Sequence, residues 1–284
     1  MSETGAESLK TNTVQHTLCI PLWGRMLATR RYPDLFPDRD AESIIRALGF
    51  DFSDKRIYKM EYTWLNTIVR QYDLAWEINH YLKAHPKAAV VELGAGLSTL
   101  RRQIGNDTNP WYNLDMAEVI PLREAHIPKG KHEKNVVCNL NDYSWFDTID
   151  FKPQDGIVFV AGGLFYYFQK EQVQLLVSAM AQRFSGGIIA FDATNAMGLK
   201  GVNKEVGMAG NESKSYFSLE NPKQELEAWS TAIVNVSEKD YMRGYLDSAI
   251  TSSFGFMTQI IMRFAAITHI SFIVHAEFAA GKLL

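Results

Sequence analysis

Hydrophobic positions in the first third of the chain recur every three or four residues, the spacing of a helix with one apolar face. The longest such run predicts a helix over residues 57–84, with the apolar stripe Met60, Trp64, Ile68, Tyr72, Ala75, Ile78 and Leu82. The His-Pro pair at 85–86 ends it, because a residue before proline disfavours the helical conformation. A shorter helix is predicted from Asp40, its N-cap, to Ala47. We therefore expect residues 1–85 to form a helical N-terminal cap region.

From residue 88 onward, short apolar runs alternate with helical patterns. The predicted strands are 88–93, 111–114, 135–139, 156–161 and 187–191, and the predicted crossover helices are 98–104, 117–125, 142–148 and 170–184. A strand as continuously apolar as residues 157–161 is typical of a parallel sheet that is buried on both faces. The alternation predicts an α/β protein with a doubly wound, Rossmann-like sheet.

The alternation stops after residue 192. Residues 193–220 contain glycines and lysines but few apolar runs, so we expect a loop or lid over the edge of the sheet. Residues 86–284 are therefore expected to form one core domain, with a lid or substrate insertion around residues 193–235.

Two helices and two strands are predicted in the last quarter of the chain. Asn221 as N-cap and Pro222 at the first helical position predict a helix that ends near residue 233. Ser237 predicts the start of another helix, which runs to about residue 264. Strands at 232–236 and 267–278 would complete a seven-stranded, mostly parallel sheet.

A strand that ends in an acid and two glycines marks a candidate nucleotide-cofactor site. Residues 90–93 are apolar apart from Glu92, and Gly94 and Gly96 follow in a tight turn. Glycine leaves room for a ligand to approach the backbone. A dinucleotide fingerprint needs a third glycine where Thr99 stands, and Glu92 would repel a pyrophosphate. The same carboxylate suits the ammonium and sulfonium charges of S-adenosylmethionine, so the turn favours that cofactor.

The next strand supplies a second candidate. Asp115 ends the run at 111–114, one crossover helix beyond the glycines, where an acid can accept both ribose hydroxyls of a nucleotide cofactor. Met116 follows at the same edge and is a further candidate for cofactor contact. The alternative is that Asp115 caps the following helix.

Further candidates follow the third and fourth strands, since the carboxyl ends of parallel strands meet at one edge. Asn141 or Asp142 would accept the exocyclic amine of adenine, and Leu140 would cover its face. The alternative is an Asx-turn that caps the next segment. At the end of the fourth strand, Ala161 and Gly162 would let the backbone approach the methionine moiety and its methyl group.

Aromatic residues near these strand ends are candidates for an apolar substrate wall, namely Trp145, Phe165, Tyr166 and Tyr167. Phe165 fits equally well as an ordinary core residue. Arg25 and Lys200 are candidate partners for an acceptor carboxylate, and Asp192 either has a functional role or caps a turn. Arg70 would pair with a cofactor carboxylate or with Asp73, and the sequence alone favours Asp73.

Composition and charge narrow the class of protein. A formal net charge of −3 over 284 residues gives no electrostatic reason to expect a nucleic-acid partner. Cys19 and Cys138 are far apart, predict neither a disulfide nor a metal site, and suit the reducing cytoplasm. The apolar stretch at 250–280 is interrupted by charged residues, so no membrane span is predicted.

Taken in order, the motifs resemble those of the leucine carboxyl methyltransferase family, and within it the tetracenomycin-type polyketide O-methyltransferases. The matching segments are 17–25, 34–38, 70–73, 90–99, 114–120, 142–145, 163–167 and 191–192. The resemblance implies a class I S-adenosylmethionine-dependent O-methyltransferase with a helical N-terminal cap. It also implies that Arg70 holds the cofactor carboxylate, as the matching arginine does in the family. Two segments depart from the family pattern: after the glycines, Ser98 and Leu100 replace a usual aspartate and a usual arginine, and at the fourth strand Gly162 replaces a usual acid.

The acceptor of the methyl group is predicted from its chemistry. A carboxylate is ionised at neutral pH and needs no base, whereas a phenol, with a pKa of about 10, needs one. No histidine follows a predicted strand end, so we expect carboxyl O-methylation of an aromatic or polyketide-like small molecule, with S-adenosylhomocysteine as product. The alternatives are a phenolic O-methyltransferase, a protein C-terminal carboxyl methyltransferase, a non-catalytic S-adenosylmethionine-binding protein and a nicotinamide oxidoreductase.

Overall fold

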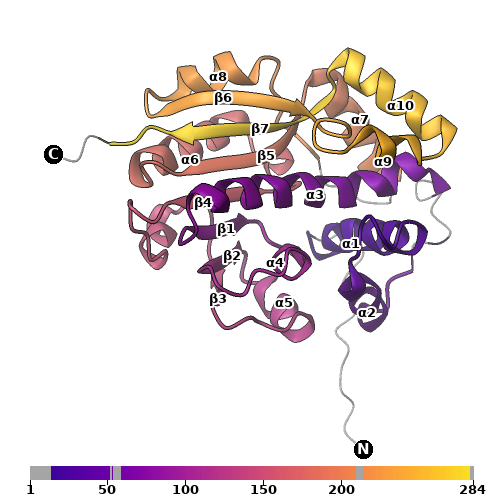
Figure 1. Ribbon diagram of the computed structural model, residues 1–284, viewed down its shortest axis with the longest axis horizontal. Helices are drawn as coiled ribbons and strands as arrows, with labels where there is room; N and C mark the ends of the chain where they lie inside the picture. The colour runs from indigo at the N-terminus through magenta and orange to yellow at the C-terminus, as the bar shows by residue number, and fades with distance from the viewer. Residues whose placement is uncertain (1–13, 52, 54–58, 209–213, 282–284) are drawn as a thin grey trace, which may run out of the picture.

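The computed structural model describes residues 14–51, 53, 59–208 and 214–281. Its centre is a seven-stranded sheet in the order β3-β2-β1-β4-β5-β7-β6 (Figure 1). The strands are β1 (Ala89–Leu93), β2 (Trp111–Asp115), β3 (Glu133–Val137), β4 (Ile157–Ala161), β5 (Ile188–Thr194), β6 (Ile233–Asp240) and β7 (Ser271–Phe278). β1 to β5 pair in parallel, and β7 is antiparallel to both of its neighbours. The prediction of a mostly parallel, doubly wound α/β sheet is confirmed.

Helices cover both faces of the sheet. On one face, α3 (Glu61–Ala84) packs Leu74 and Ile78 in a core cluster with alternate strand residues such as Val158. On the other face, α6 (Lys170–Arg183) packs Leu176 in the cluster that contains Phe159. Burial on both faces explains why β4 is apolar at every position, and β1 at every position except Glu92, rather than at every second one.

The N-terminal helices form a separate cluster beside the sheet. α1 (Val14–Arg31) and α2 (Arg39–Leu48) share this cluster with Leu97 of the glycine turn, and α1 packs along α3 (Figure 1). The predicted N-cap of α2 was wrong by two residues: Asp38 is the N-cap, and its side chain accepts from the amide of Ala41 at 3.2 Å. Residues 57 and 58 of the predicted long helix lie outside the described residues.

The crossover helices on the β1–β3 side are short. They are α4 (Leu100–Gln103), α5 (Ile120–His126) and the 3-10 turn η2 (Tyr143–Thr148), and a further 3-10 turn, η3 (Phe165–Tyr167), follows β4. The predicted strands that correspond to β1–β5 begin and end within three residues of the observed ones, whereas those that correspond to β6 and β7 are displaced by four residues at one end. The observed helices α4 and α5 are shorter than the crossover helices predicted at 98–104 and 117–125.

The prediction of a loop over residues 193–220 was wrong for most of its length. β5 continues to Thr194, and α7 (Ala196–Met208) follows at once. Residues 214–219 then return to the sheet, where the amide of Leu219 donates to the carbonyl of Thr194 at 2.9 Å and that of Tyr216 to the carbonyl of Tyr166 at 2.7 Å. This segment therefore lies over the carboxyl ends of β4 and β5.

The predicted helix over residues 237–264 was also wrong. β6 runs through Asp240 as an edge strand paired with β7, and α9 (Ser248–Ser252) and α10 (Phe256–Thr268) follow it. The predicted helix start at Asn221 is confirmed by α8 (Pro222–Trp229), where Asn221 accepts from the amide of Gln224 at 3.1 Å. Within the described ranges, no helix combines the length and apolar character needed to cross a bilayer.

Candidate functional site

The carboxyl ends of the central strands converge at one edge of the sheet. Leu93, the last residue of β1, pairs with Leu114 on one side and with Ala161 on the other, and Ala161 pairs with Phe191. β1 is the point at which the strand order reverses, because β2 and β3 lie to one side of it and β4 and β5 to the other. Ligands of open α/β sheets bind in the crevice at this point.

The glycine turn after β1 adopts a backbone that excludes side chains. Gly94 and Gly96 have φ values of +61° and +48°, in the left-handed region that favours glycine. A Cβ atom at Gly96 would lie 2.9 Å from Leu18 Cδ2, and one at Gly94 would clash with Leu164. The positive φ values thus favour glycine at both positions, which fits the predicted cofactor approach.

Asp115 is bonded directly to the glycine turn. Its Oδ2 atom accepts from the amide of Gly96 at 2.7 Å, and its Oδ1 atom accepts from the amide of Met116 at 2.8 Å. Burial raises the pKa of this carboxyl group, which outweighs the opposite effect of the two amides. Asp115 does not cap α5, whose N-cap is Val119, so the alternative role considered for it is excluded.

Glu92 and Arg25 lie behind the turn. Glu92 is buried, and its Oε1 atom accepts from Trp111 Nε1 at 2.9 Å, while burial raises the pKa of its carboxyl group. Arg25 is buried, donates from Nη2 to the carbonyl of Leu97 at 2.8 Å and pairs through Nη1 with Asp38 at 3.2 Å. These positions argue against the predicted contacts of Glu92 with cofactor cations and of Arg25 with an acceptor.

Arg70 of α3 reaches the ends of β4 and β5. Its Nη1 atom lies 3.2 Å from Asp192 Oδ2, and Asp192 Oδ1 accepts from the amide of Gly163 at 2.6 Å. Burial lowers the pKa of Arg70, but Asp192, together with Tyr241 and Tyr166, raises that pKa overall. The predicted alternative partner, Asp73, is fully buried, and within the described part of the chain neither of its carboxylate oxygens has a hydrogen-bond partner. Asp192 is therefore the partner of Arg70.

This pair presents opposite charges at one point of the sheet edge. A cation and an anion 3.2 Å apart match the two charges of an α-amino acid, whose carboxylate and ammonium are equally close. Gly162 and Gly163 line the same place, since a Cβ at Gly163 would lie 2.6 Å from Arg70 Nη1. The arrangement can bind a zwitterionic group.

The predicted adenine contacts follow β3. Asp142 Oδ1 accepts from the amide of Ser144 at 3.1 Å and caps η2, as the Asx-turn alternative expects. Asn141 and Asp142 are exposed, whereas Leu140 is buried and its carbonyl accepts from Trp145 Nε1 at 3.3 Å. The cap occupies one oxygen of Asp142 and leaves the adenine contact a prediction.

The predicted aromatic wall divides into two groups. Trp145 and Phe165 are buried in the core, where Phe165 meets Phe191 at a ring-centroid distance of 5.0 Å, so their positions argue against substrate contact. Tyr166 is half-buried beside Asp192, and burial raises the pKa of its hydroxyl well above the usual value. Tyr167 is exposed, as is Lys200 on α7.

Tyr241 is a site neighbour that the sequence did not indicate. It is buried, its hydroxyl donates to the carbonyl of Asn66 at 2.7 Å, and Arg70 and Asp192 influence the pKa of that hydroxyl. Burial raises this pKa well above the usual value, so the hydroxyl stays protonated. The residue had been assigned to a helix that does not form, so no sequence signal brought it to the edge.

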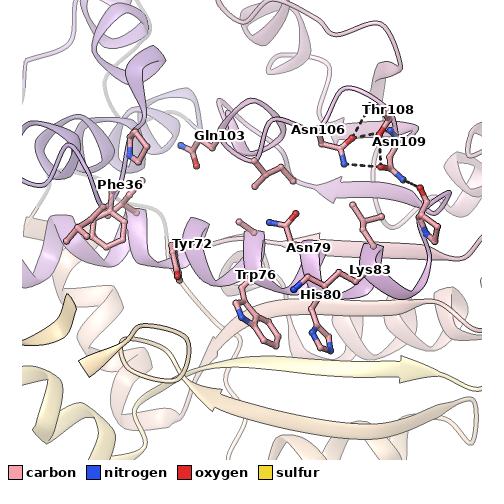
Figure 2. A pocket seen from close by; sticks show the side chains of 17 residues that line it. Phe36, Tyr72, Trp76, Asn79, His80, Lys83, Gln103, Asn106, Thr108 and Asn109 are labelled. Carbon is pink, nitrogen blue, oxygen red and sulfur yellow. Dashed lines mark hydrogen bonds between the residues drawn. The ribbon is translucent and has the colours of Figure 1, made fainter. Parts of the chain in front are cut away.

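A groove of about 850 Å³ lies elsewhere, along the side of α3 (Figure 2). Tyr72, Trp76 and His80 line it from α3 at four-residue intervals, and Asn106 and Asn109 close its far end. Asn109 donates to the carbonyl of Ala88, at the amino end of β1. None of the predicted site residues lines the groove, so it is distinct from the strand-end site.

Comparisons with known proteins agree with this geometry. The leucine carboxyl methyltransferase family matches residues 19–181, more than half of the chain. The tetracenomycin polyketide synthesis O-methyltransferase TcmP of Streptomyces glaucescens is 27% identical over 188 residues, which are 66% of this chain and 68% of that protein.

Two solved structures share the fold at low sequence identity. A Thermobifida fusca protein assigned as a methyltransferase superposes with a TM-score of 0.60 at 13% identity, over 95% of this chain and 96% of its own. The plantazolicin methyltransferase BpumL, solved with a triazolic desmethylPZN analogue and S-adenosylhomocysteine, gives a TM-score of 0.51 at 12% identity, over 94% and 100%.

The sheet order and the glycine turn at the strand-order reversal define a class I methyltransferase fold. The chain belongs to the leucine carboxyl methyltransferase family. Family and fold together confirm the predicted cofactor, S-adenosylmethionine, and identify the chain as an S-adenosylmethionine-dependent methyltransferase.

Proposed function

We propose that this protein transfers a methyl group from S-adenosylmethionine to a carboxylate oxygen of an aromatic or polyketide-like small molecule. The observation that carries the proposal is the Arg70–Asp192 pair beside the glycine turn, which offers a site for the amino-acid end of the cofactor. The polyketide-like acceptor rests on the similarity to TcmP. We expect the reaction in the cytoplasm, with no nucleic acid or membrane as partner.

The bound cofactor supplies an electrophilic methyl group on a cationic sulfur. Arg70 would bind its carboxylate, and Asp192 would face its ammonium. Asp115 would accept from the ribose hydroxyls, because each carboxylate oxygen has a lone pair beyond the one that its amide partner uses. Asn141 and Asp142 would accept from the adenine amine. These residues would thus hold the cofactor along the strand ends. The rate would then depend mainly on the alignment of the methyl group with the acceptor oxygen and on the exclusion of water.

The choice of a carboxylate rests on the proton chemistry of this edge. Tyr166 and Tyr241 have strongly raised pKa values, so neither acts as a base. A carboxylate acceptor is already ionised and needs no base, whereas a phenol would need one to remove its proton.

A methyl-transfer assay tests the acceptor class. The purified protein would be incubated with S-adenosylmethionine and separate panels of aromatic carboxylic acids, phenols of matched size and short peptides. We expect products only from the small acids, and their methyl groups should be released as methanol in mild alkali, as esters are. Alkali-stable ethers from the phenols, or methylation of peptides alone, would contradict the proposal.

A further inference from the structure

Helix α10 carries an unusual concentration of exposed apolar side chains. Of 13 large hydrophobic residues classed as exposed among the described residues, five lie on this helix: Phe256, Met257, Ile260, Phe264 and Ile267, which are 42% to 84% exposed. Their spacing places them within about 100° of one another around the helix axis, so they form one stripe. We call this set the α10 stripe.

The opposite face of α10 is already buried. Thr258, Met262 and Ala265 point into the molecule, and Met262 belongs to the cluster that joins α10 to α3 and the region after β6. α10 is therefore apolar on both faces. A helix of this kind is normally buried on all sides, yet among the described residues none covers the outer stripe.

We infer that the α10 stripe is the interface through which two copies of this protein form a two-fold symmetric dimer. Arg263 is the only charged residue in α10, so the stripe offers no charge pattern that would select a charged partner. An uncharged surface can meet its own copy without like-charge repulsion, and two-fold dimers are the commonest closed assembly.

The order of side chains along the stripe suits antiparallel pairing. Phe256, Ile260, Phe264 and Ile267 alternate aromatic and aliphatic side chains. When α10 meets its copy in reverse direction about its midpoint, Ile260 lies opposite Phe264 and Met257 opposite Ile267. The ring of Phe264 then faces a smaller aliphatic group, which allows ridges of one helix to enter grooves of the other.

The size of the stripe is sufficient for a dimer contact. A buried aromatic side chain removes about 150–250 Å² from water, so the five partly exposed residues offer on the order of 600 Å² per subunit. Met60 extends the surface, because its neighbour Glu61 accepts from the amide of Gly255 at 2.7 Å and half of Met60 is exposed. A standard interface buries about 800 Å² per partner. The stripe thus offers about three quarters of a standard interface, which is the size of a weak, dilution-sensitive dimer.

Sedimentation equilibrium on the full chain over a dilution series tests this inference. We expect wild type to approach twice the chain mass of 32.2 kDa at high concentration, and Phe264→Glu to remain at 32.2 kDa. Leu175→Glu is the matched control, since Leu175 is an exposed apolar residue on α6 and this variant should still dimerise. Ile267→Asp, at the most exposed position of the stripe, repeats the test with little effect on folding.

Two results would overturn the inference. One is a wild-type protein that stays monomeric at every concentration, and the other is a Phe264→Glu variant that is folded by circular dichroism and dimerises like wild type. A monomeric wild type that floats with phosphatidylcholine vesicles would assign the stripe to a lipid surface instead. None of these outcomes depends on the methyltransferase assay.

Discussion

The guanidinium of Arg70 and the carboxylate of Asp192 lie 3.2 Å apart, although 122 residues separate them in the chain. α3 brings the arginine to the edge of the sheet, and the end of β5 brings the acid. The acid also accepts from the amide of Gly163 at 2.6 Å, which fixes it against the end of β4. The pair can therefore bind the carboxylate and the ammonium of one amino-acid group.

Asp192→Asn is predicted to weaken binding of S-adenosylhomocysteine by about 10- to 100-fold, because hydrogen bonds to charged groups contribute about 1.5–3 kcal/mol. Calorimetric titration measures this change. 5′-Methylthioadenosine is the control ligand, since it lacks the amino-acid end and its affinity should change by less than about threefold. Equal losses of affinity for both ligands would show that the Arg70–Asp192 pair does not bind the amino-acid end of the cofactor.

Gly163→Ala should weaken S-adenosylhomocysteine binding, because the new Cβ would lie 2.6 Å from Arg70 Nη1 and displace it. Gly49→Ala is the matched control: its φ of +70° nearly equals the +71° of Gly163, but no atom of the described residues lies within 4 Å of its Cβ position. Both variants should lose about 1 kcal/mol of stability from backbone strain. A Gly163→Ala protein that binds like Gly49→Ala would show that Arg70 is not needed.

Arg25→Met should lower the free energy of unfolding by about 3 kcal/mol, because it leaves Asp38 buried without its cation. Thr99, which follows the glycine turn, also donates to Asp38 at 3.0 Å, so we expect the loss of the Arg25 cation to destabilise that turn as well. Urea unfolding measures the change. Arg30→Met removes the exposed pair with Glu42 and should change stability by less than about 1 kcal/mol. Similar effects of the two variants would contradict the structural role of Arg25.

Asp73 gives the stability of the protein a defined pH dependence. Burial raises the pKa of its carboxyl group well above the usual value, and Asp240 and Glu77 add to the effect. The folded state therefore keeps a proton on Asp73 that the unfolded state loses above about pH 4. Between that pH and the raised pKa of the folded state, Asp73 makes the free energy of unfolding fall as pH rises. Asp73→Asn should be more stable than wild type at pH 7, with the difference vanishing toward pH 4.

Thermal unfolding across this pH range measures that difference. The surface variant Asp34→Asn serves as control and should stay within about 0.5 kcal/mol of wild type at both pH values. An Asp73→Asn protein that is less stable than wild type at pH 7 would mean that the buried carboxylate is ionised and stabilising.

The parallel half of the fold was predictable because burial on both faces leaves unbroken apolar runs, as in β4. β6 was mistaken at its end for a helix because it is an edge strand with exposed polar residues, and its pairing with β7 decides its conformation. α7 was expected to be a loop because it contains three glycines, yet its attachment to the end of β5 makes it helical. Long-range pairing of this kind leaves no local pattern.

The candidate site was partly predictable for a similar reason. Asp115 and the glycines follow strands directly, so their meeting follows from the topology. The partner of Arg70 could not be predicted in this way, because Asp73 is near Arg70 in sequence whereas Asp192 is near it only in the folded chain. Glu92 and Arg25 both have hydrogen-bond partners inside the protein that residue type alone does not indicate, namely Trp111 and the carbonyl of Leu97.

Calorimetric titration with S-adenosylhomocysteine, repeated on Asp115→Ala and with NAD as control ligand, tests the central claim most directly. The account predicts micromolar binding of S-adenosylhomocysteine, at least a tenfold loss in Asp115→Ala and no binding of NAD. Absence of S-adenosylhomocysteine binding to the wild-type protein, or unchanged affinity in Asp115→Ala, would contradict the assignment of the strand-end site.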